Sequence, residues 1–430
     1  MIGIYNIVIN GETPGSIVVN GNVIEGTYKQ GALTPAVGEW INGHGCESYP
    51  AGIDPHVHDR WGEPEREDTE HLEAACIEGG VGTIVVMPNT KPPYDRAEQT
   101  TARLSGFNTI NVLAWMAATR TNYNERCEVH RFFPGLIPGS KLMMASTNNP
   151  ETLVDDDLSQ RRILEENADI GCITTIHAEA EDLINRNRLD YQRMSRQLMV
   201  AHHCKVRASP VEVEGIRRIL NIHRDVGGRI HIAHVSTVGG IELILDAKAR
   251  GQLVTFETCP HYWMLNDSWI ERQNGGDYKM NPALRPPAEQ QRVFEYFCSG
   301  AVDLSATDHA PHPSRLKTLP GLDECPSGVP GVETNIPLVY RLKQRGDISA
   351  KQFVDLTSRH AAQILGLNKG ELKAGFDADI ILLDPRKTET LADDRIKSKC
   401  GWTPYRGEEV SPVALMIVGG QIVKNDLDRQ

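Results

Sequence analysis

The chain has 430 residues, of which 40% are hydrophobic, so it can bury a large core and has the usual size of an α/β barrel with an accessory domain. Its formal net charge of −12 argues against nucleic acid as a partner, and an anionic substrate would need a local basic group to hold it. No stretch approaches about 18 apolar residues and the first residues do not read as a signal peptide, so we expect neither a membrane span nor secretion.

Both ends of the chain are predicted to form short strands. Residues 4–12 and 15–26 near one end, and 377–385 and 414–425 near the other, are alternating apolar runs with NG and GG turn signals. We expect these segments to pair with one another. They would form a small β-sandwich domain from residues 1–50 and 366–430.

Between the two ends, eight apolar, strand-like runs alternate with helix-like segments. The runs are 49–58, 82–89, 110–117, 139–144, 172–179, 229–236, 253–261 and 302–309. The clearest helical segments are 68–80, 213–228 and 239–251. This alternation is typical of parallel βα units, and eight of them predict an α/β fold with a (β/α)₈ barrel over residues 51–365.

Polar residues end several of these runs. His56, His58 and Arg60 lie at alternate positions, so they share one face of an extended chain. Active sites of such barrels lie at the carboxyl ends of the strands, where polar residues of separate strands meet. The candidates for that position are His56, His58, Lys141, His177, His234 and Asp308.

Four histidines and a carboxylate are a ligand set that suits zinc. Six groups exceed the need of one four-coordinate ion, which indicates two metals. Lys141 fits this set only if carbon dioxide has converted its amine to a carbamate, whose oxygens can bridge both ions. Taken singly, a histidine pair indicates a solvated face and a strand-end lysine a salt bridge, so it is the set that points to metal. We expect His231 and His261 to be satisfied groups that are either structural or support the ligands from behind. His202, His203 and His223 should lie on the surface.

The order HxH…K…H…H…D resembles the amidohydrolase superfamily and, within it, the dihydroorotases. His56, His58 and Arg60 match the dihydroorotase hallmark HxHxR. The resemblance covers essentially the whole chain. It includes MPNT at 87–90, GSKLMM at 139–144, IHAE at 176–179, HIAHVST at 231–237, YKMNPALR at 278–285 and ATDHAPH at 306–312.

This resemblance implies the reversible interconversion of N-carbamoyl-L-aspartate and dihydroorotate plus water, a step of pyrimidine biosynthesis. A hydroxide bridging two Zn²⁺ ions would attack the ring carbonyl. The six groups above would hold the ions, with carboxylated Lys141 as the bridging ligand. Asp308 would act as general base and then acid. The implied substrate-binding residues are Arg60, Asn89 and His312, with Asn281 from the substrate-loop segment and Thr147 from a lid at 145–151.

Two kinds of alternative stay open. Hydantoinases, dihydropyrimidinases and allantoinases share the metal set, but they are expected to lack the hallmark arginine and the full TDHAPH string. An inactive dihydroorotase-like scaffold subunit should lack at least one of the six metal groups.

The remaining expectations concern surroundings and partners. Nine scattered cysteines without a CxxC pair favour a reduced, cytoplasmic protein. The partner is a small-molecule substrate, with no nucleic acid and no membrane. We expect a homo-oligomer such as a dimer, and association with aspartate transcarbamoylase stays open.

Overall fold

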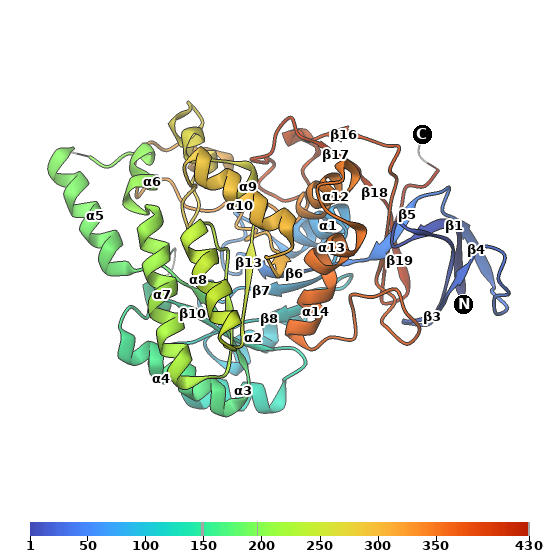
Figure 1. Ribbon diagram of the computed structural model, residues 1–430, viewed down its shortest axis with the longest axis horizontal. Helices are drawn as coiled ribbons and strands as arrows, with labels where there is room; N and C mark the ends of the chain where they lie inside the picture. Colours follow the sequence, from blue (N-terminus) through green and yellow to red (C-terminus); the bar gives the residue numbers. More distant parts are fainter. Residues whose placement is uncertain (148–149, 196, 429–430) are drawn as a thin grey trace.

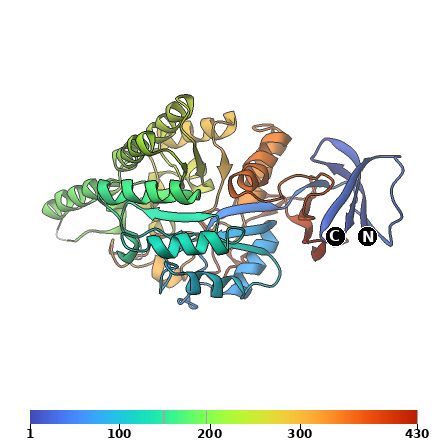
Figure 2. The ribbon, with the colours of Figure 1, turned by 90° about the horizontal axis from the view of Figure 1, so that it is seen from below.

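The computed structural model describes residues 1–147, 150–195 and 197–428. A barrel surrounded by helices forms the larger part of the molecule, and a β-domain that carries both termini lies at one end (Figures 1 and 2). Within the described ranges, no helix is both long and apolar enough to cross a membrane.

Each of the eight apolar runs contains or overlaps a strand of the barrel. The barrel strands are β6 (Gly52–Val57), β7 (Val81–Val86), β8 (Asn111–Ala114) with its continuation β9 (Met116–Ala117), β10 (Gly139–Met143), β11 (Ile173–His177), β12 (Arg229–Ile232), β13 (Val254–Thr258) and β14 (Leu304–Ser305). Parallel ladders join β6 to β8 and β9 to β14 in chain order. A parallel bridge between Val57 and His309 links the last strand segment to the first, so the predicted (β/α)₈ barrel is confirmed.

Helices follow most strands and surround the barrel. They are α1 (Thr69–Gly79), α2 (Ala97–Leu104), α3 (Tyr123–Phe132), α4 (Asp157–Ile170), α5 (Glu181–Met194), α6 (His203–Val206), α7 (Ser209–Val226), α8 (Val238–Ala249), α9 (Pro260–Met264), α10 (Pro287–Ser299), α11 (Ser314–Lys317), α12 (Asn335–Arg345), α13 (Ala350–Val354) and α14 (His360–Leu365). Single turns are η1 (Pro150–Thr152), η2 (Val200–His202), η3 (Asp267–Glu271), η4 (Gly275–Tyr278), the π-helical η5 (Asp355–Arg359) and η6 (Asp393–Arg395).

The three helices predicted most clearly are α1, α7 and α8. Local signals set the bounds of α1: the Asp68 side chain accepts a hydrogen bond from the backbone N–H of His71, and Gly80 ends the helix at φ 77°. The buried side of α7 includes Ile216, Ile219 and Leu220, which follow the helical repeat.

The start of β10 leaves no room for a side chain at Gly139, which pairs with Ile173 of β11. A methyl group there would lie 2.0 Å from the carbonyl oxygen of Ile173. We expect Gly139→Ala to lower the free energy of unfolding by about 1–3 kcal/mol, measured by urea unfolding. Gly135→Ala is the control, because its added methyl meets no heavy atom within 4 Å. Equal losses in both variants would contradict the explanation.

The β-domain is built from both ends of the chain, as predicted. Its strands are β1 (Ile2–Ile9), β2 (Thr13–Asn20), β3 (Val23–Lys29), β4 (Glu39–Asn42), β5 (Glu47–Pro50), β15 (Ile380–Leu383), β18 (Val413–Val418) and β19 (Gln421–Asn425), and a separate pair is formed by β16 (Glu389–Thr390) and β17 (Glu409–Val410). The eight strands form one continuous sheet in which β5 and β15 join the two ends. Residues such as Ile4, Ile17 and Leu415 share one apolar core, so the predicted sandwich is a single sheet whose parts enclose a common interior.

The division at residues 50 and 365 stays a proposal. It is supported by β5, which ends in the β-domain sheet at Pro50 two residues before β6 begins, and by α14, which ends at Leu365.

The prediction of surface positions was wrong for His203 and His223, which are 3% and 2% exposed. Packing determines both positions: His203 Nε2 lies 2.8 Å from the carbonyl oxygen of Met280, and His223 Nε2 lies 3.1 Å from that of Gly228. His202 is half-buried. The expectation that His261 is a satisfied group was wrong in part, because its buried Nε2 has no hydrogen-bond partner among the described residues.

Candidate active site

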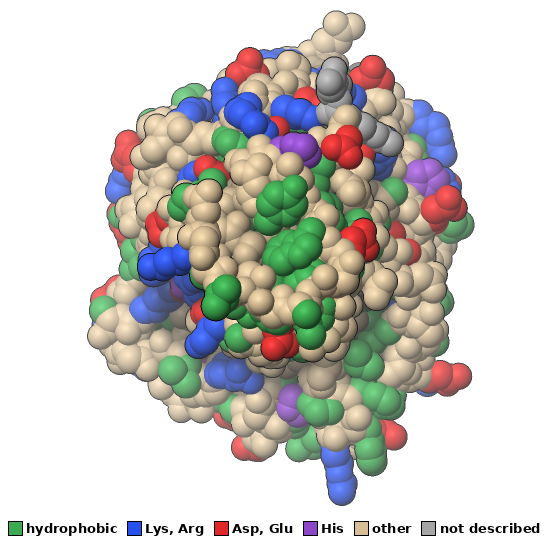
Figure 3. All heavy atoms as spheres, turned by 90° about the vertical axis from the view of Figure 1, so that its right-hand side faces the viewer, with side chains coloured by type: hydrophobic (Ala, Val, Ile, Leu, Met, Phe, Trp, Pro, Cys, Tyr) green, Lys and Arg blue, Asp and Glu red, His purple; other side chains and the backbone are tan. Residues whose placement is uncertain are grey.

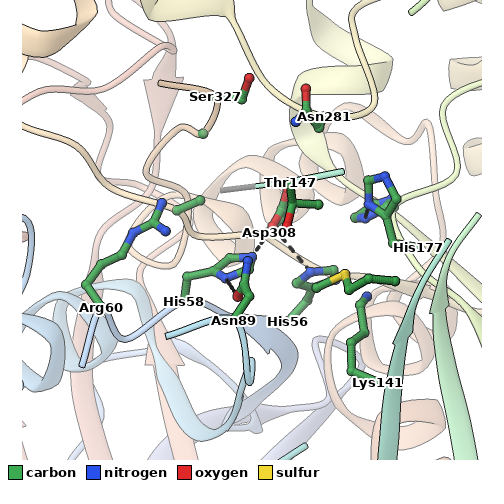
Figure 4. Close-up of a pocket in the computed structure, with 14 residues that line it drawn as sticks. His56, His58, Arg60, Asn89, Lys141, Thr147, His177, Asn281, Asp308 and Ser327 are labelled. Carbon is green, nitrogen blue, oxygen red and sulfur yellow. Dashed lines mark hydrogen bonds and ion pairs between the residues drawn. The ribbon is translucent and has the colours of Figure 1, made fainter. Parts of the chain in front are cut away.

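A pocket of about 400 Å³ lies at the carboxyl ends of the barrel strands. The sequence predicted most of its lining, and every predicted site residue except His312 belongs to it (Figure 4). The lining residues are His56, His58, Arg60, Asn89, Lys141, Met143, Thr147, His177, His234, Asn281, Asp308, Ala310, Ser327 and Gly328. The barrel thus brings together side chains that come from most of its strands.

His56, His58 and Asp308 form the first group of candidate ligands, with their donor atoms close enough to share one ion. His56 Nδ1 donates to the carboxylate of Glu257, and His58 Nδ1 lies 2.7 Å from Asn89 Oδ1. These contacts hold the protons at Nδ1 and leave lone pairs at Nε2. The two Nε2 atoms face Asp308 Oδ1 at 3.3 Å and 2.9 Å, so three acceptors converge and suit a divalent cation.

His177 and His234 form a second group. His177 Nε2 lies 2.8 Å from Glu179 Oε2 and donates its proton there, which leaves a lone pair at Nδ1. This Nδ1 lies 2.9 Å from His234 Nε2. His234 Nδ1 is buried and has no partner among the described residues. A cation between the two facing nitrogens would satisfy both.

Lys141 lies beside both groups, 1% exposed, and its Nζ has no hydrogen-bond partner in the described parts of the chain. A buried ammonium without a partner is costly, and burial accordingly lowers the pKa of Lys141 to about 8. The neutral amine needed for reaction with carbon dioxide is therefore accessible near neutral pH. An unpartnered amine between two groups of ligands fits a bridging carbamate.

The electrostatics of the pocket favour cation binding. Burial lowers the pKa of His58 to about 4, and burial together with His177 keeps the pKa of His234 well below its usual value, so both rings are neutral. Burial alone would raise the pKa of Asp308, but its contacts with His56 and His58 outweigh burial and hold that pKa well below its usual range. The site thus offers neutral imidazoles at His58 and His234 and an ionised carboxylate at Asp308.

Arg60 lies on the opposite side of the pocket from His177, with its guanidinium directed inward (Figure 4). It is 4% exposed, and burial lowers its pKa to about 10, so it stays charged. Its Nε donates to the carbonyl oxygen of Pro311 at 3.2 Å, and a terminal nitrogen lies 3.0 Å from His312 Nε2. The nearby carboxylates are engaged elsewhere: Asp59 pairs with Arg103 and Glu63 with Arg66.

The comparisons with known proteins agree with this geometry. Residues 296–423 match the model of the amidohydrolase family. The chain is 32% identical over 419 residues to the dihydroorotase of Trichlorobacter lovleyi, covering 96% of this chain and 95% of that protein. It is 33% identical over 412 residues to the dihydroorotase of Geobacter metallireducens, covering 95% and 94%. The chain belongs to the dihydroorotase family. It is therefore a metal-dependent cyclic amidohydrolase.

The fold of this dihydroorotase family member is shared with hydantoinases. The D-hydantoinase (dihydropyrimidinase) of a Thermus species superposes with a TM-score of 0.90 at 24% identity, covering 100% of this chain and 96% of that one. The same barrel and β-domain therefore occur in hydantoinases, so the fold alone does not identify the substrate.

Three of the six non-glycine residues with a positive φ among the described residues lie in the same pocket. Arg60, His234 and Asp308 have positive φ angles of 54°, 41° and 45°, a region that side-chain-bearing residues rarely adopt. Such conformations persist only where surrounding contacts hold them, and they cluster at functional sites. In this dihydroorotase family member, the strain falls on a candidate substrate-binding residue and two candidate ligands.

The substrate side of the pocket includes residues that the sequence did not single out, namely Met143, Ala310, Ser327 and Gly328. Thr147 Oγ1 and Asn281 Oδ1 are buried atoms without a partner among the described residues, and both residues line the pocket. The predicted lid at 145–151 includes residues 148 and 149, which lie outside the described residues. His312 lies behind Arg60 rather than in the lining, and its contact with substrate stays a prediction.

Two further carboxylates were missed as functional residues, although both lie in sequence segments noted above. Glu257 and Glu179 are 1% and 0% exposed and bond to candidate ligand rings. A buried glutamate two residues after His177 was a usable signal, because ligand histidines commonly donate to a carboxylate. No comparable signal in the sequence connects Glu257 with His56, which lies on a different strand.

Proposed function

We propose that this chain is a dihydroorotase that interconverts N-carbamoyl-L-aspartate and dihydroorotate plus water in pyrimidine biosynthesis. The observation that carries the proposal is Arg60, a buried cation for which the described residues supply no carboxylate partner. Buried charges are normally paired. A substrate carboxylate would complete the pair, and dihydroorotate carries this group whereas dihydrouracil does not.

We assign two Zn²⁺ ions to the pocket. His56, His58 and Asp308 would hold one ion, His177 and His234 the other, and carboxylated Lys141 both. The lone pairs that face one another in the two groups, and the unpartnered amine of Lys141, support this assignment. The chemistry that such ions supply is the activation of water and the polarisation of the amide carbonyl.

Asp308 is proposed to move the proton in this reaction. Its carboxylate is ionised and lies at the centre of the pocket between the two sides (Figure 4). It would accept the proton of the attacking water and deliver it to the ring nitrogen that leaves. In the direction of ring closure, the same carboxylate would take the proton from the carbamoyl nitrogen.

The substrate is oriented from the Arg60 side. The guanidinium offers a planar fork of donors that matches a carboxylate. Asn89 accepts from His58 through Oδ1, which leaves its amide N–H groups free to donate to the same carboxylate. Burial and the charge of Arg60 keep the pKa of His312 well below its usual value, so this ring is neutral. Its Nε2 lies 3.0 Å from a terminal nitrogen of Arg60 and 2.9 Å from the carbonyl oxygen of Ser327, and these contacts help to fix the position of the guanidinium. Thr147 and Asn281 would contact the rest of the substrate.

Arg60→Met tests the proposal. It should lower kcat/KM for dihydroorotate, chiefly through a higher KM. The corresponding loss of transition-state stabilisation should be roughly 2–4 kcal/mol, the scale of a lost charge-assisted contact in a desolvated site. Metal content should not change, since Arg60 is not a proposed ligand. The measurement is kcat/KM for dihydroorotate and dihydrouracil in wild type and variant.

Arg66→Met is the matched control, because Arg66 lies near Arg60 but pairs with Glu63 and does not line the pocket. It should leave kcat/KM close to the wild-type value. Turnover of dihydrouracil by the wild type at the rate of dihydroorotate would move the assignment to the hydantoinases.

A scaffold subunit is disfavoured because all six proposed metal groups are present and line one pocket.

The remaining predictions concern surroundings and partners. All nine cysteines are free, which supports a reducing, cytoplasmic location. Hydrophobic side chains gather on the face of the β-domain end (Figure 3). The exposed Tyr5 and Trp40, whose rings lie 6.1 Å apart, belong to this domain and support a homo-oligomer. Association with aspartate transcarbamoylase and the absence of nucleic-acid and membrane partners stay predictions.

A further inference from the structure

Glu257 lies inside the barrel, behind the pocket and outside its lining. It belongs to β13 and is 1% exposed. One oxygen, Oε1, accepts from His56 Nδ1 and, at 3.2 Å, from the backbone N–H of His234. The other oxygen, Oε2, lies 3.0 Å from His231 Nε2. A single carboxylate therefore contacts residues of β6 and of the β12 segment.

These contacts constrain the two groups of candidate ligands differently. At His56, the carboxylate fixes the ring orientation and leaves the Nε2 lone pair directed toward Asp308. At His234, it holds the backbone N–H of a residue whose φ is 41°, a conformation that side-chain-bearing residues rarely adopt and that persists only where surrounding contacts support it. The first contact aims a side chain, and the second stabilises a strained segment of backbone.

The geometry points to Glu257 as a positioning residue that organises both metal groups at once. This inference rests on the proposed two-metal function and deepens it. His231 contributes as the third donor to the carboxylate, and its other ring nitrogen lies 2.8 Å from Thr255 Oγ1, so the His231 ring is itself held at both nitrogens.

Glu179 provides the matched comparison. It is also a buried glutamate that bonds to a candidate ligand ring, His177, and its charge is balanced by Arg207. Among the described residues, however, Glu179 bonds to no second candidate ligand. If the inference is right, the two glutamates differ in how many metal ions depend on them.

The test compares Glu257→Gln with Glu179→Gln by zinc content. Each chain is loaded with Zn²⁺, equilibrated with a graded series of a zinc chelator, and analysed for zinc ions per chain. Loss of a carboxylate that orients a ligand typically costs 10–100-fold in metal affinity. We expect Glu179→Gln to release one ion at a chelator concentration about 10–100-fold lower than wild type requires. It should keep the other ion. Glu257→Gln should release both ions early. Circular dichroism of the zinc-free proteins checks that both variants fold.

Glu257→Asp is the second variant, which keeps the charge but withdraws the carboxylate by one methylene group. It should also release both ions early, and it serves if the amide variant does not fold. The inference is overturned if Glu257→Gln and Glu257→Asp lose only one ion or match wild type. It is also overturned if Glu179→Gln releases both ions early. In that case the loss of one ion would release the other through a ligand that both ions share, and Glu257 would not be needed to explain the joint loss. Wild type holding fewer than two ions would instead overturn the two-metal function, and the inference with it.

Discussion

Asp308→Asn is expected to lower kcat by at least 10²–10⁴-fold, the range typical of a group that transfers a proton in the transition state. Asparagine keeps the size of the side chain and can still present an oxygen to a cation. It cannot accept a proton, because its amide is not basic. The measurement is kcat for dihydroorotate at saturating substrate, with zinc per chain determined on the same sample.

The zinc count separates proton transfer from ligand loss. A large fall in kcat with two ions still bound assigns proton transfer to Asp308, whereas a fall that parallels lost zinc assigns it only a ligand role. Asp303→Asn is the control, because Asp303 lies at the other end of the same strand segment and pairs with Lys248. It should keep a kcat near that of wild type. Near-normal turnover by Asp308→Asn would remove Asp308 from the proton-transfer role.

The barrel and the pocket could be predicted because both depend on patterns that are local in the sequence. Each barrel strand is a buried apolar run. Because the strands are parallel, the residues that follow these runs lie together at one end of the barrel. Lys141, His177 and His234 needed no knowledge of tertiary contacts to be placed together. The same logic placed Arg60, because it stands two residues beyond His58.

The groups behind the pocket could not be predicted in this way. His56 and Glu257 are 201 residues apart in sequence and lie on different strands, so their contact exists only once the barrel closes. His203 was misjudged for the same reason, since its burial depends on a carbonyl group 77 residues away. Sequence pattern identifies which side chains reach the mouth of a barrel. It does not identify which buried carboxylate determines the tautomer of each ring.

The tautomers matter because they decide what the pocket can bind. If His56 and His58 carried their protons at Nε2, Asp308 would accept two hydrogen bonds and the group would be satisfied without metal. Glu257 and Asn89 hold those protons at Nδ1, on the far side of the rings. Cation binding by His56 and His58 therefore depends on residues outside the HxHxR motif.

Lys141→Ala is expected to abolish most turnover and to leave fewer than two zinc ions per chain. The proposed carbamate supplies a negative charge and an oxygen to each ion, and alanine supplies neither. Loss of one ion removes either water activation or carbonyl polarisation, each worth several kcal/mol, so we expect kcat to fall by about 10²–10³-fold or more. Zinc analysis and kcat are measured on the same preparation.

Incorporation of ¹³C-labelled bicarbonate tests the carbamate itself. With a pKa of about 8, Lys141 presents the free amine in about a tenth of chains at pH 7, enough to react with dissolved carbon dioxide. Lys317 is an internal control, since it is also buried and has a pKa lowered by burial to about 7, but its Nζ donates to the carbonyl oxygens of Lys279, Pro326 and Gly328. Carbon NMR should show one carbamate signal in wild type and none in Lys141→Ala. A signal that persists in the variant, or two tightly held zinc ions with normal turnover, would exclude Lys141 as the bridge.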